Sequence, residues 1–213
     1  MRAGAPPPPE TTAAVASPST LSFELFPART LRLALFRDVS SAAELAALVA
    51  AAGGGADAHA ALIDASALAG TLQVRAAAQR ALHNEAHASL RTNGLHSELV
   101  YALHPSRNIG HALKMAGVRA EESERAAGAP PPPPRSILVA AFDAHDASLA
   151  VLCSSLASAT RVRDVCAALD APCSAAACTA IAKRWKLSPA ETAAGPAAFL
   201  DAVVTRMATG ELK

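Results

Sequence analysis

The sequence has few aromatic residues, no long apolar run and almost no net charge, and each absence excludes a class of protein. Its 213 residues include one Trp, one Tyr and five Phe, so Leu, Val, Ile and Ala must supply most of the core. Its longest aliphatic runs, such as residues 137–142, are far shorter than the roughly 18 to 20 residues that a membrane-spanning helix needs. With 19 basic and 18 acidic residues, the whole chain shows no charge bias toward nucleic acid. This length favours one domain.

Secretion signals and metal-binding cysteine motifs are missing as well. The first ten residues lack an apolar stretch and contain one Arg, a pattern unlike a secretory signal. The Cys residues form no C-x-x-C pair, and no His flanks them at zinc-finger spacing. We therefore expect a soluble protein of the cytoplasm and nucleus, with reduced thiols that pack as small apolar side chains. The four are Cys153, Cys166, Cys173 and Cys178.

Two proline-rich segments divide the chain. Residues 1–20 are rich in Pro, Ala, Ser and Thr, and we expect them to form a disordered extension. Residues 21–213 then form the domain, and residues 121–135, which contain five consecutive prolines, form an inserted surface loop. An alternative is that the prolines are ligands for SH3 or WW domains, which would make the protein a generic adaptor.

Between these segments the hydrophobic pattern predicts alternating strands and helices. A helix that starts at Ser40 or Ser41 ends at the glycines from Gly53, and Asn108 or Ser106 begins a short helix that Gly117 ends. The sequence LSPAE has a capping box from Ser188 to Glu191. We predict strands over 31–36, 98–103 and 137–142, and helices over 66–87, 109–116, 197–207 and parts of 143–183. The core side of the second helix is predicted to carry Leu68, Leu72, Val74, Ala78 and Leu82.

One motif suggests a metal site, because His83 and His87 lie four residues apart on a predicted helix. Zinc peptidase motifs place Glu directly after the first His or directly before the second. Here Glu85 is two residues after His83, about 200° around the helix, so it points away from any metal held by the His pair. A metal-dependent hydrolase that uses these His residues stays an alternative. Our main prediction has no catalytic residue, metal or cofactor.

A basic segment is the second candidate. Residues 71–119 contain six Lys or Arg and two Glu, and only Tyr101 offers an aromatic surface there. An ordinary solvated helix face explains such a segment, and a phosphate-contacting surface is the alternative. The phosphate-contact candidates are Arg75, Arg91 and Arg107.

Apolar stripes on two helices are the third candidate. They cover residues 109–116 and 197–207, while Asp201, Thr205 and Arg206 are expected to face away. Such stripes usually pack in a core, but without a catalytic motif they also suit a protein that binds partners through helix faces.

The order of several segments resembles the TPRKB family. They are FELFP followed by LRLALFRDV, then the His-bearing helix, LRTNGLHSELVYALHPSRNIGHALKMAGV, and FLDAVVTRMA. The resemblance covers residues 21–119, 137–142 and 185–213. Its most specific parts are Arg91 and Thr92 with Glu98, the helix from Asn108, and the helix around Met207. The segment from 153 to 178 departs from the family pattern.

The resemblance implies an α/β (α+β) fold, a single domain with a mostly antiparallel sheet packed by several helices and with no activity of its own. Family members are subunits of the KEOPS (EKC) complex that bind the atypical kinase PRPK. The complex, with its threonylcarbamoyl transferase subunit, modifies the adenosine beside the anticodon of tRNA, and archaeal relatives contact the tRNA 3′ end. The implied partners are therefore a PRPK-like kinase, the other KEOPS subunits and tRNA, with no membrane. The kinase-binding candidates are Ile109, Leu113, Leu200, Val203, Val204 and Met207.

Overall fold

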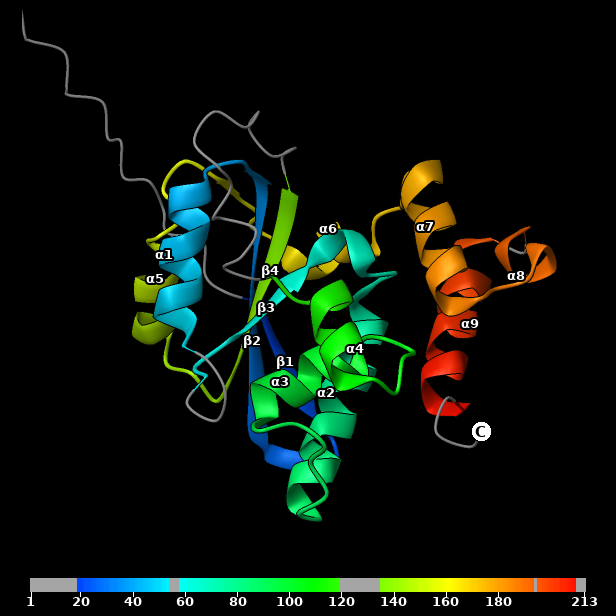
Figure 1. The fold of residues 1–213 in the computed structure, drawn as a ribbon, viewed down its shortest axis with the longest axis horizontal. Helices are drawn as coiled ribbons and strands as arrows, with labels where there is room; N and C mark the ends of the chain where they lie inside the picture. Colours follow the sequence, from blue (N-terminus) through cyan, green and yellow to red (C-terminus); the bar gives the residue numbers. More distant parts are fainter. Residues whose placement is uncertain (1–18, 54–57, 119–134, 194, 210–213) are drawn as a thin grey trace, which may run out of the picture.

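The computed structural model describes residues 19–53, 58–118, 135–193 and 195–209, and its centre is a five-stranded antiparallel sheet (Figure 1). The strand order is β1-β2-β4-β3, and β5 pairs with β2. The long strand β2 is central because β1, β4 and β5 all pair with it. This arrangement confirms the predicted α+β class and the strands at 31–36 and 137–142. The strands are β1 Ser19–Phe23, β2 Phe26–Val39, β3 Ala61–Asp64, β4 Arg135–Phe142 and β5 Thr160–Arg161.

Both faces of the sheet are covered by helices, so alternate residues of β2 and β4 enter two different cores. Leu33 and Leu138 belong to one cluster, while Phe36 and Val139 belong to the other. Burial on both faces explains why residues 137–142 are almost continuously apolar instead of alternating with polar residues. Their uniform hydrophobicity predicted a buried strand correctly.

Two helices cover one face, namely α1 (Ala42–Ala52) and α5 (Asp146–Cys153) (Figure 1). Leu48 of α1 and Leu149 of α5 are buried in the same cluster with the sheet. The side-chain oxygen of Ser41 accepts a hydrogen bond from the backbone N–H of Glu44 at 3.2 Å, and Gly53 ends the helix. Both ends of α1 thus follow the predicted capping signals.

The opposite face carries the other helices of the described chain. Two of them, α2 and α3, pack on the sheet with α4 beside them, while α7, α8 and α9 lie farther out, as Figure 1 shows. A 3₁₀ turn, η2 (Ala65–Ala67), precedes α2. The helices are α2 Thr71–Ala86, α3 Leu95–Ala102, α4 Ile109–Ala116, α6 Val165–Asp170, α7 Ala175–Trp185, α8 Pro189–Ala193 and α9 Pro196–Thr209.

One predicted strand is wrong, because residues 98–103 fall mostly within α3. Their Val, Tyr and Leu content favours a strand locally. In the fold, however, Leu99, Val100 and Tyr101 are all buried where α3 packs against α2 and the sheet. Tertiary packing overrides the local preference here.

Smaller corrections concern where elements begin and which side chains are buried. The α-helix begins at Thr71 rather than at residue 66, and Leu72 is 42% exposed instead of buried. Leu72 and Val74 are two residues apart, about 200° around a helix, so one face cannot bury both. Ser19 and Thr20, which were predicted to belong to the disordered extension, form part of β1.

The proline-rich predictions cannot be compared with the fold. Residues 1–18 and 119–134, which contain the proline runs, lie outside the described residues. Among the helices that are described, none has the length and apolar character needed to span a bilayer.

Candidate functional site

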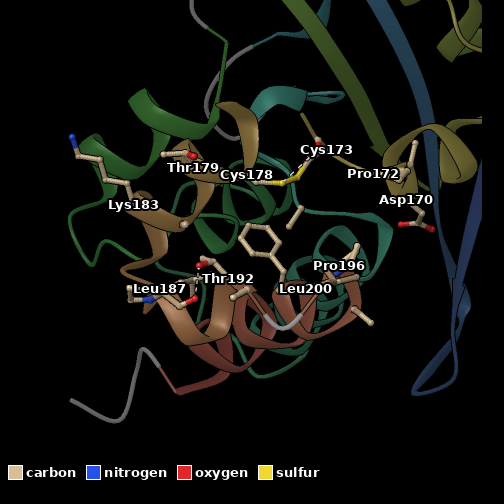
Figure 2. A pocket seen from close by; sticks show the side chains of 18 residues that line it. Asp170, Pro172, Cys173, Cys178, Thr179, Lys183, Leu187, Thr192, Pro196 and Leu200 are labelled. Atoms are coloured by element: carbon tan, nitrogen blue, oxygen red, sulfur yellow. Dashed lines mark hydrogen bonds between the residues drawn. A yellow bond between two sulfur atoms is a disulfide. The ribbon is translucent and has the colours of Figure 1, made fainter. Parts of the chain in front are cut away.

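An open groove of about 680 Å³ lies among α7, α8, α9 and the loop that joins α6 to α7. We call it the apolar groove. Figure 2 shows Leu200 and Pro196 on one side and Pro172 with two Cys residues on the other. The groove presents few polar side chains, and Lys183 and Asp170 stand at its edge. Its larger apolar lining residues are Pro172, Leu187, Pro189, Pro196, Phe199 and Leu200.

One end of the groove is held by a contact between distant parts of the chain. Asp170, at the end of α6, accepts a hydrogen bond from the backbone N–H of Thr71 at 2.7 Å. Gly70 precedes α2 with φ of 157°, and an added Cβ would lie 3.0 Å from the Asp170 carboxylate and 3.3 Å from Leu200. Glycine therefore permits α2, α6 and α9 to meet closely at this point.

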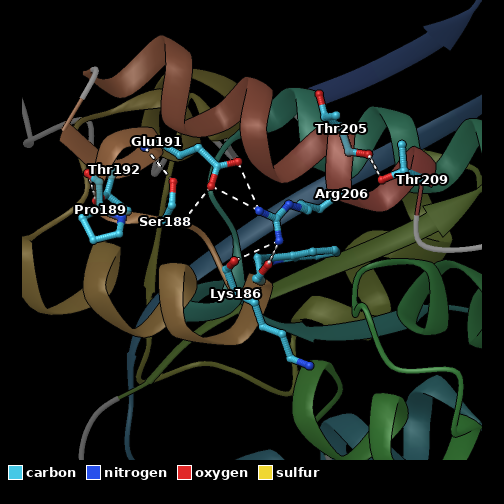
Figure 3. A network of polar contacts seen from close by, with 9 residues as sticks. Lys186, Ser188, Pro189, Glu191, Thr192, Thr205, Arg206 and Thr209 are labelled. Atoms are coloured by element: carbon cyan, nitrogen blue, oxygen red, sulfur yellow. Dashed lines mark hydrogen bonds and ion pairs between the residues drawn. The ribbon is translucent and has the colours of Figure 1, made fainter. Parts of the chain in front are cut away.

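The outer side of the groove is braced by Arg206, which was predicted to face away from the apolar stripe of α9 (Figure 3). Its side chain is 38% exposed and forms hydrogen bonds that the stripe did not predict. Its guanidinium donates to the carbonyl of Trp185 at 3.3 Å and to that of Lys186 at 2.9 Å. It also donates to Glu191 at 3.2 Å. Arg206 on α9 therefore caps the last carbonyls of α7 and bonds to α8 at the same time.

The predicted capping box at Ser188 is confirmed and continues this network. The backbone N–H of Ser188 donates to the Glu191 carboxylate at 2.6 Å, and the backbone N–H of Glu191 donates to the Ser188 hydroxyl at 3.3 Å. The hydrogen bonds from Ser188, followed by the charge of Arg206, lower the pKa of Glu191. The Glu191 side chain is thus favoured in its charged form, which is the form that Arg206 and Ser188 bind.

The groove wall also contains a disulfide, which contradicts the prediction that the cysteines are reduced thiols. Cys173 and Cys178 are joined, with their Cα atoms 5.9 Å apart (Figure 2). The other two Cys residues have free thiols. Burial raises the pKa of Cys153 to about 11, which favours the protonated thiol near neutral pH. A spacing of five residues escapes the C-x-x-C criterion, which is why the sequence did not reveal the pair.

The predicted kinase-binding residues fall into two environments. Leu200 lines the apolar groove, Val204 is half-buried on the same helix, and Ile109 on α4 is 36% exposed. In contrast, Val203 is fully buried and Met207 is 6% exposed, both within the core. We therefore assign these two residues to the core rather than to a docking surface. Leu113 is half-buried against the core.

The predicted phosphate contacts lie partly together. Arg91 and Arg107 line a small recess, which Arg80 and Arg206 also line, and we call it the basic recess. Arg75 lies apart from it and donates to the backbone carbonyl of Ser22 at 3.1 Å. Tyr101 lines the recess but is only 3% exposed, so it offers no open stacking surface.

His83 near the end of α2 and His87 at its C-cap lie side by side, with ring centroids 4.1 Å apart. The ring Nδ1 of His87 hydrogen-bonds the carbonyl of His83 at 2.8 Å. Glu85 instead pairs with Arg29, in agreement with its predicted direction away from the pair. Within the described ranges there is no group of three His, Cys, Asp or Glu that could hold a metal ion.

Together the fold and the groove define a small α+β protein with an open apolar groove. Residues 36–211 match the family described as Kinase binding protein CGI-121, and the chain belongs to this family. It is also similar to the EKC/KEOPS complex subunit TPRKB of Danio rerio, with 31% identity over 99 residues. The match covers 46% of this chain and 54% of that relative, so the chain spans about half of the relative's length. The predicted family resemblance is confirmed.

Proposed function

We propose that this protein is a non-catalytic, kinase-binding subunit of a KEOPS-type complex in the cytoplasm and nucleus, and that the apolar groove receives a PRPK-like kinase. The family match supports kinase binding. The groove supports the location, because it is open, largely apolar and walled by braced helices. Docking of an apolar segment in such a preformed groove would cost little ordering of this chain.

Isothermal titration calorimetry with the PRPK-like kinase of the same organism tests this proposal. Ala197 is exposed in the first turn of α9 and lines the groove. Ala197→Glu places a charge in the groove, while a carboxylate near a helix N-terminus suits the helix dipole. We expect tight one-to-one binding by the wild type and a loss of about 100-fold in the variant, since burying an unpaired charge is costly.

Two further variants make this experiment specific. Ala47→Glu adds the same side chain to an exposed position of α1, on the opposite face of the sheet, and should bind as the wild type does. Ile109→Glu tests whether α4 belongs to the interface. No binding by the wild type would refute the kinase-binding role, and full binding by Ala197→Glu would place the interface elsewhere.

We also propose that the assembled complex uses this subunit to contact tRNA during threonylcarbamoyl modification. The observation that favours this is the basic recess, where four Arg side chains gather beside Trp185. The positive charges of Arg80, Arg91 and Arg107 would attract a tRNA phosphate to the surface at the mouth of the recess.

Charge reversal tests the tRNA contact. Arg107→Glu in the assembled complex should weaken tRNA binding and reduce its dependence on salt, because a phosphate contact releases counterions. Arg75→Glu is the matched control, since Arg75 lies away from the recess. Equal tRNA binding by the wild type and Arg107→Glu would remove the recess from the proposal.

A further inference from the structure

The disulfide between Cys173 and Cys178 occupies a particular position at the start of α7. Ser174 caps this helix by accepting a hydrogen bond from the backbone N–H of Ala177 at 3.2 Å. Cys173 is the residue before the cap, and Cys178 is the fourth residue of the helix. Many helices place two packed apolar side chains at these positions, which fix the direction in which the chain enters. Here a covalent bond performs that role.

Several features of the pair distinguish it from a permanent structural crosslink. Both Cys residues are half-buried and line the open groove, so small thiols and disulfides can reach them. The bond closes a loop of very few residues, and short loops gain the least stability from a crosslink.

We propose that Cys173 and Cys178 form a reversible thiol–disulfide site that reacts with low-molecular-weight disulfides and thiols, and that its redox state sets the shape of the apolar groove. Oxidation begins when one thiolate attacks a disulfide such as oxidised glutathione, forming a mixed disulfide and releasing one glutathione thiolate. The second Cys thiolate then attacks the mixed disulfide, which closes the internal bond and releases the second glutathione. Two protons and two electrons leave the protein, and the glutathione disulfide accepts them.

The groove depends on this bond because Cys173 belongs to the loop that forms one of its walls. Ala171, Pro172 and Cys173 all line the groove between α6 and α7. The bond ties that loop to the first turn of α7. After reduction, the Ser174 cap still holds the helix, but the loop loses its covalent link, and any ligand of the groove must order it on binding.

The chemical part of the proposal is tested without any partner. The full chain is equilibrated with reduced and oxidised glutathione at several ratios, free thiols are alkylated, and the sites are identified by mass spectrometry. We expect one two-electron transition at Cys173 and Cys178, while Cys153 and Cys166 are alkylated after denaturation at every ratio. A pair that stays reduced even in oxidised glutathione alone, or a disulfide that includes Cys166, would overturn the proposal.

Hydrogen exchange tests the structural part. Backbone amides of the loop and of the first turn of α7 should exchange at least several-fold faster after reduction, and the Cys173→Ser variant should match the reduced protein. Amides of α4, which contributes no residue to the groove, serve as the internal reference. Equal exchange in both redox states would show that the bond does not shape the groove.

The effect on docking rests on the proposed kinase-binding function. We expect the oxidised protein to bind the PRPK-like kinase about tenfold more tightly than the reduced protein or the Cys173→Ser variant. The reason is that binding to the reduced protein must also order one or two side chains of the loop, which costs about this factor in affinity. Cys166→Ser is the control and should keep the difference. Equal affinities would overturn redox control while leaving kinase docking intact. Absence of kinase binding in both redox states would refute the proposed function. The alkylation and hydrogen-exchange experiments would still show whether Cys173 and Cys178 form a reversible disulfide that shapes the groove.

Discussion

At the residue scale, the most informative side chain is Glu98, which is completely buried on α3. Its carboxylate accepts four hydrogen bonds, from the side-chain amide of Asn84, the backbone N–H groups of Arg91 and Thr92, and the hydroxyl of Thr92. The distances are 2.9 to 3.0 Å. The carboxylate therefore joins α2, α3 and the turn between them. These hydrogen bonds give Arg91, Thr92 and Glu98, which belong to the family pattern, a shared structural role.

Replacement of Glu98 by Gln should lower the free energy of unfolding by about 2 to 3 kcal/mol. The NH₂ group of Gln would replace one carboxylate oxygen and would face groups that donate hydrogen bonds to that oxygen. These donors would then be buried without an acceptor, which costs roughly this amount. Urea denaturation measures the change. Glu85→Gln is the matched control, because its half-exposed ion pair with Arg29 is worth at most about 1 kcal/mol. Equal losses in the two variants would contradict this role of Glu98.

His104 should make stability depend on pH. Burial, followed by the charges of Arg184 and His111, lowers its pKa from 6.5 to about 4. Between these values the unfolded chain binds a proton that the folded chain does not, so stability is lost as the pH falls from 6.5 toward 4. With allowance for solvent screening, we expect a loss of roughly 1 to 2 kcal/mol.

The variant His104→Asn isolates this effect. Nδ1 of His104 accepts a hydrogen bond from the backbone N–H of Ser106 at 3.0 Å, and the Asn carbonyl can accept the same bond without titrating. Urea denaturation at pH 7.5 and pH 5 should show a smaller difference for the variant than for the wild type. An unchanged difference would assign the pH dependence to other groups, such as His96, whose pKa burial also lowers.

At the scale of elements, helix ends were predicted better than helix interiors. The caps at Ser41, Asn108 and Ser188 all form the expected hydrogen bonds, because capping depends on a few neighbouring residues. The strand predicted at residues 98–103 failed because its apolar residues are buried by α2 and the sheet, and these contacts lie outside the segment whose local preference was assessed. The partners of Arg206 were not predicted for a similar reason, since the three come from α7, α8 and the loop between them.

The bracing role of Arg206 predicts a specific loss in the variant Arg206→Lys. Lys keeps the charge but cannot bond several oxygens in one plane, so we expect a loss of about 1 to 2 kcal/mol in the free energy of unfolding. Thermal and urea denaturation measure it. Asp201→Asn changes an exposed residue of the same helix and should stay within about 0.5 kcal/mol of the wild type. If both variants were equally stable, the brace would have no energetic role.

At the scale of the whole molecule, the sheet and its class were predictable, but the groove was not. Strands β2 and β4 carry strong local signals, whereas the groove is assembled from Ala69, the α6–α7 loop and three helices whose Ala-rich sequences suit many structures. A helical stripe also cannot reveal which of its residues a neighbouring helix will cover. Val203 and Met207 proved to be core, while Leu200 on the same helix lines the groove.

We propose that the kinase docks in the apolar groove, and hydrogen exchange of the full chain with and without the PRPK-like kinase tests this location. The measurement locates the contact without any substitution. We expect slower exchange on kinase addition in α7, α8, α9 and the loop before them, with α1 and α5 unchanged. Protection confined to α1 and α5, or no protection anywhere in the presence of excess kinase, would contradict it.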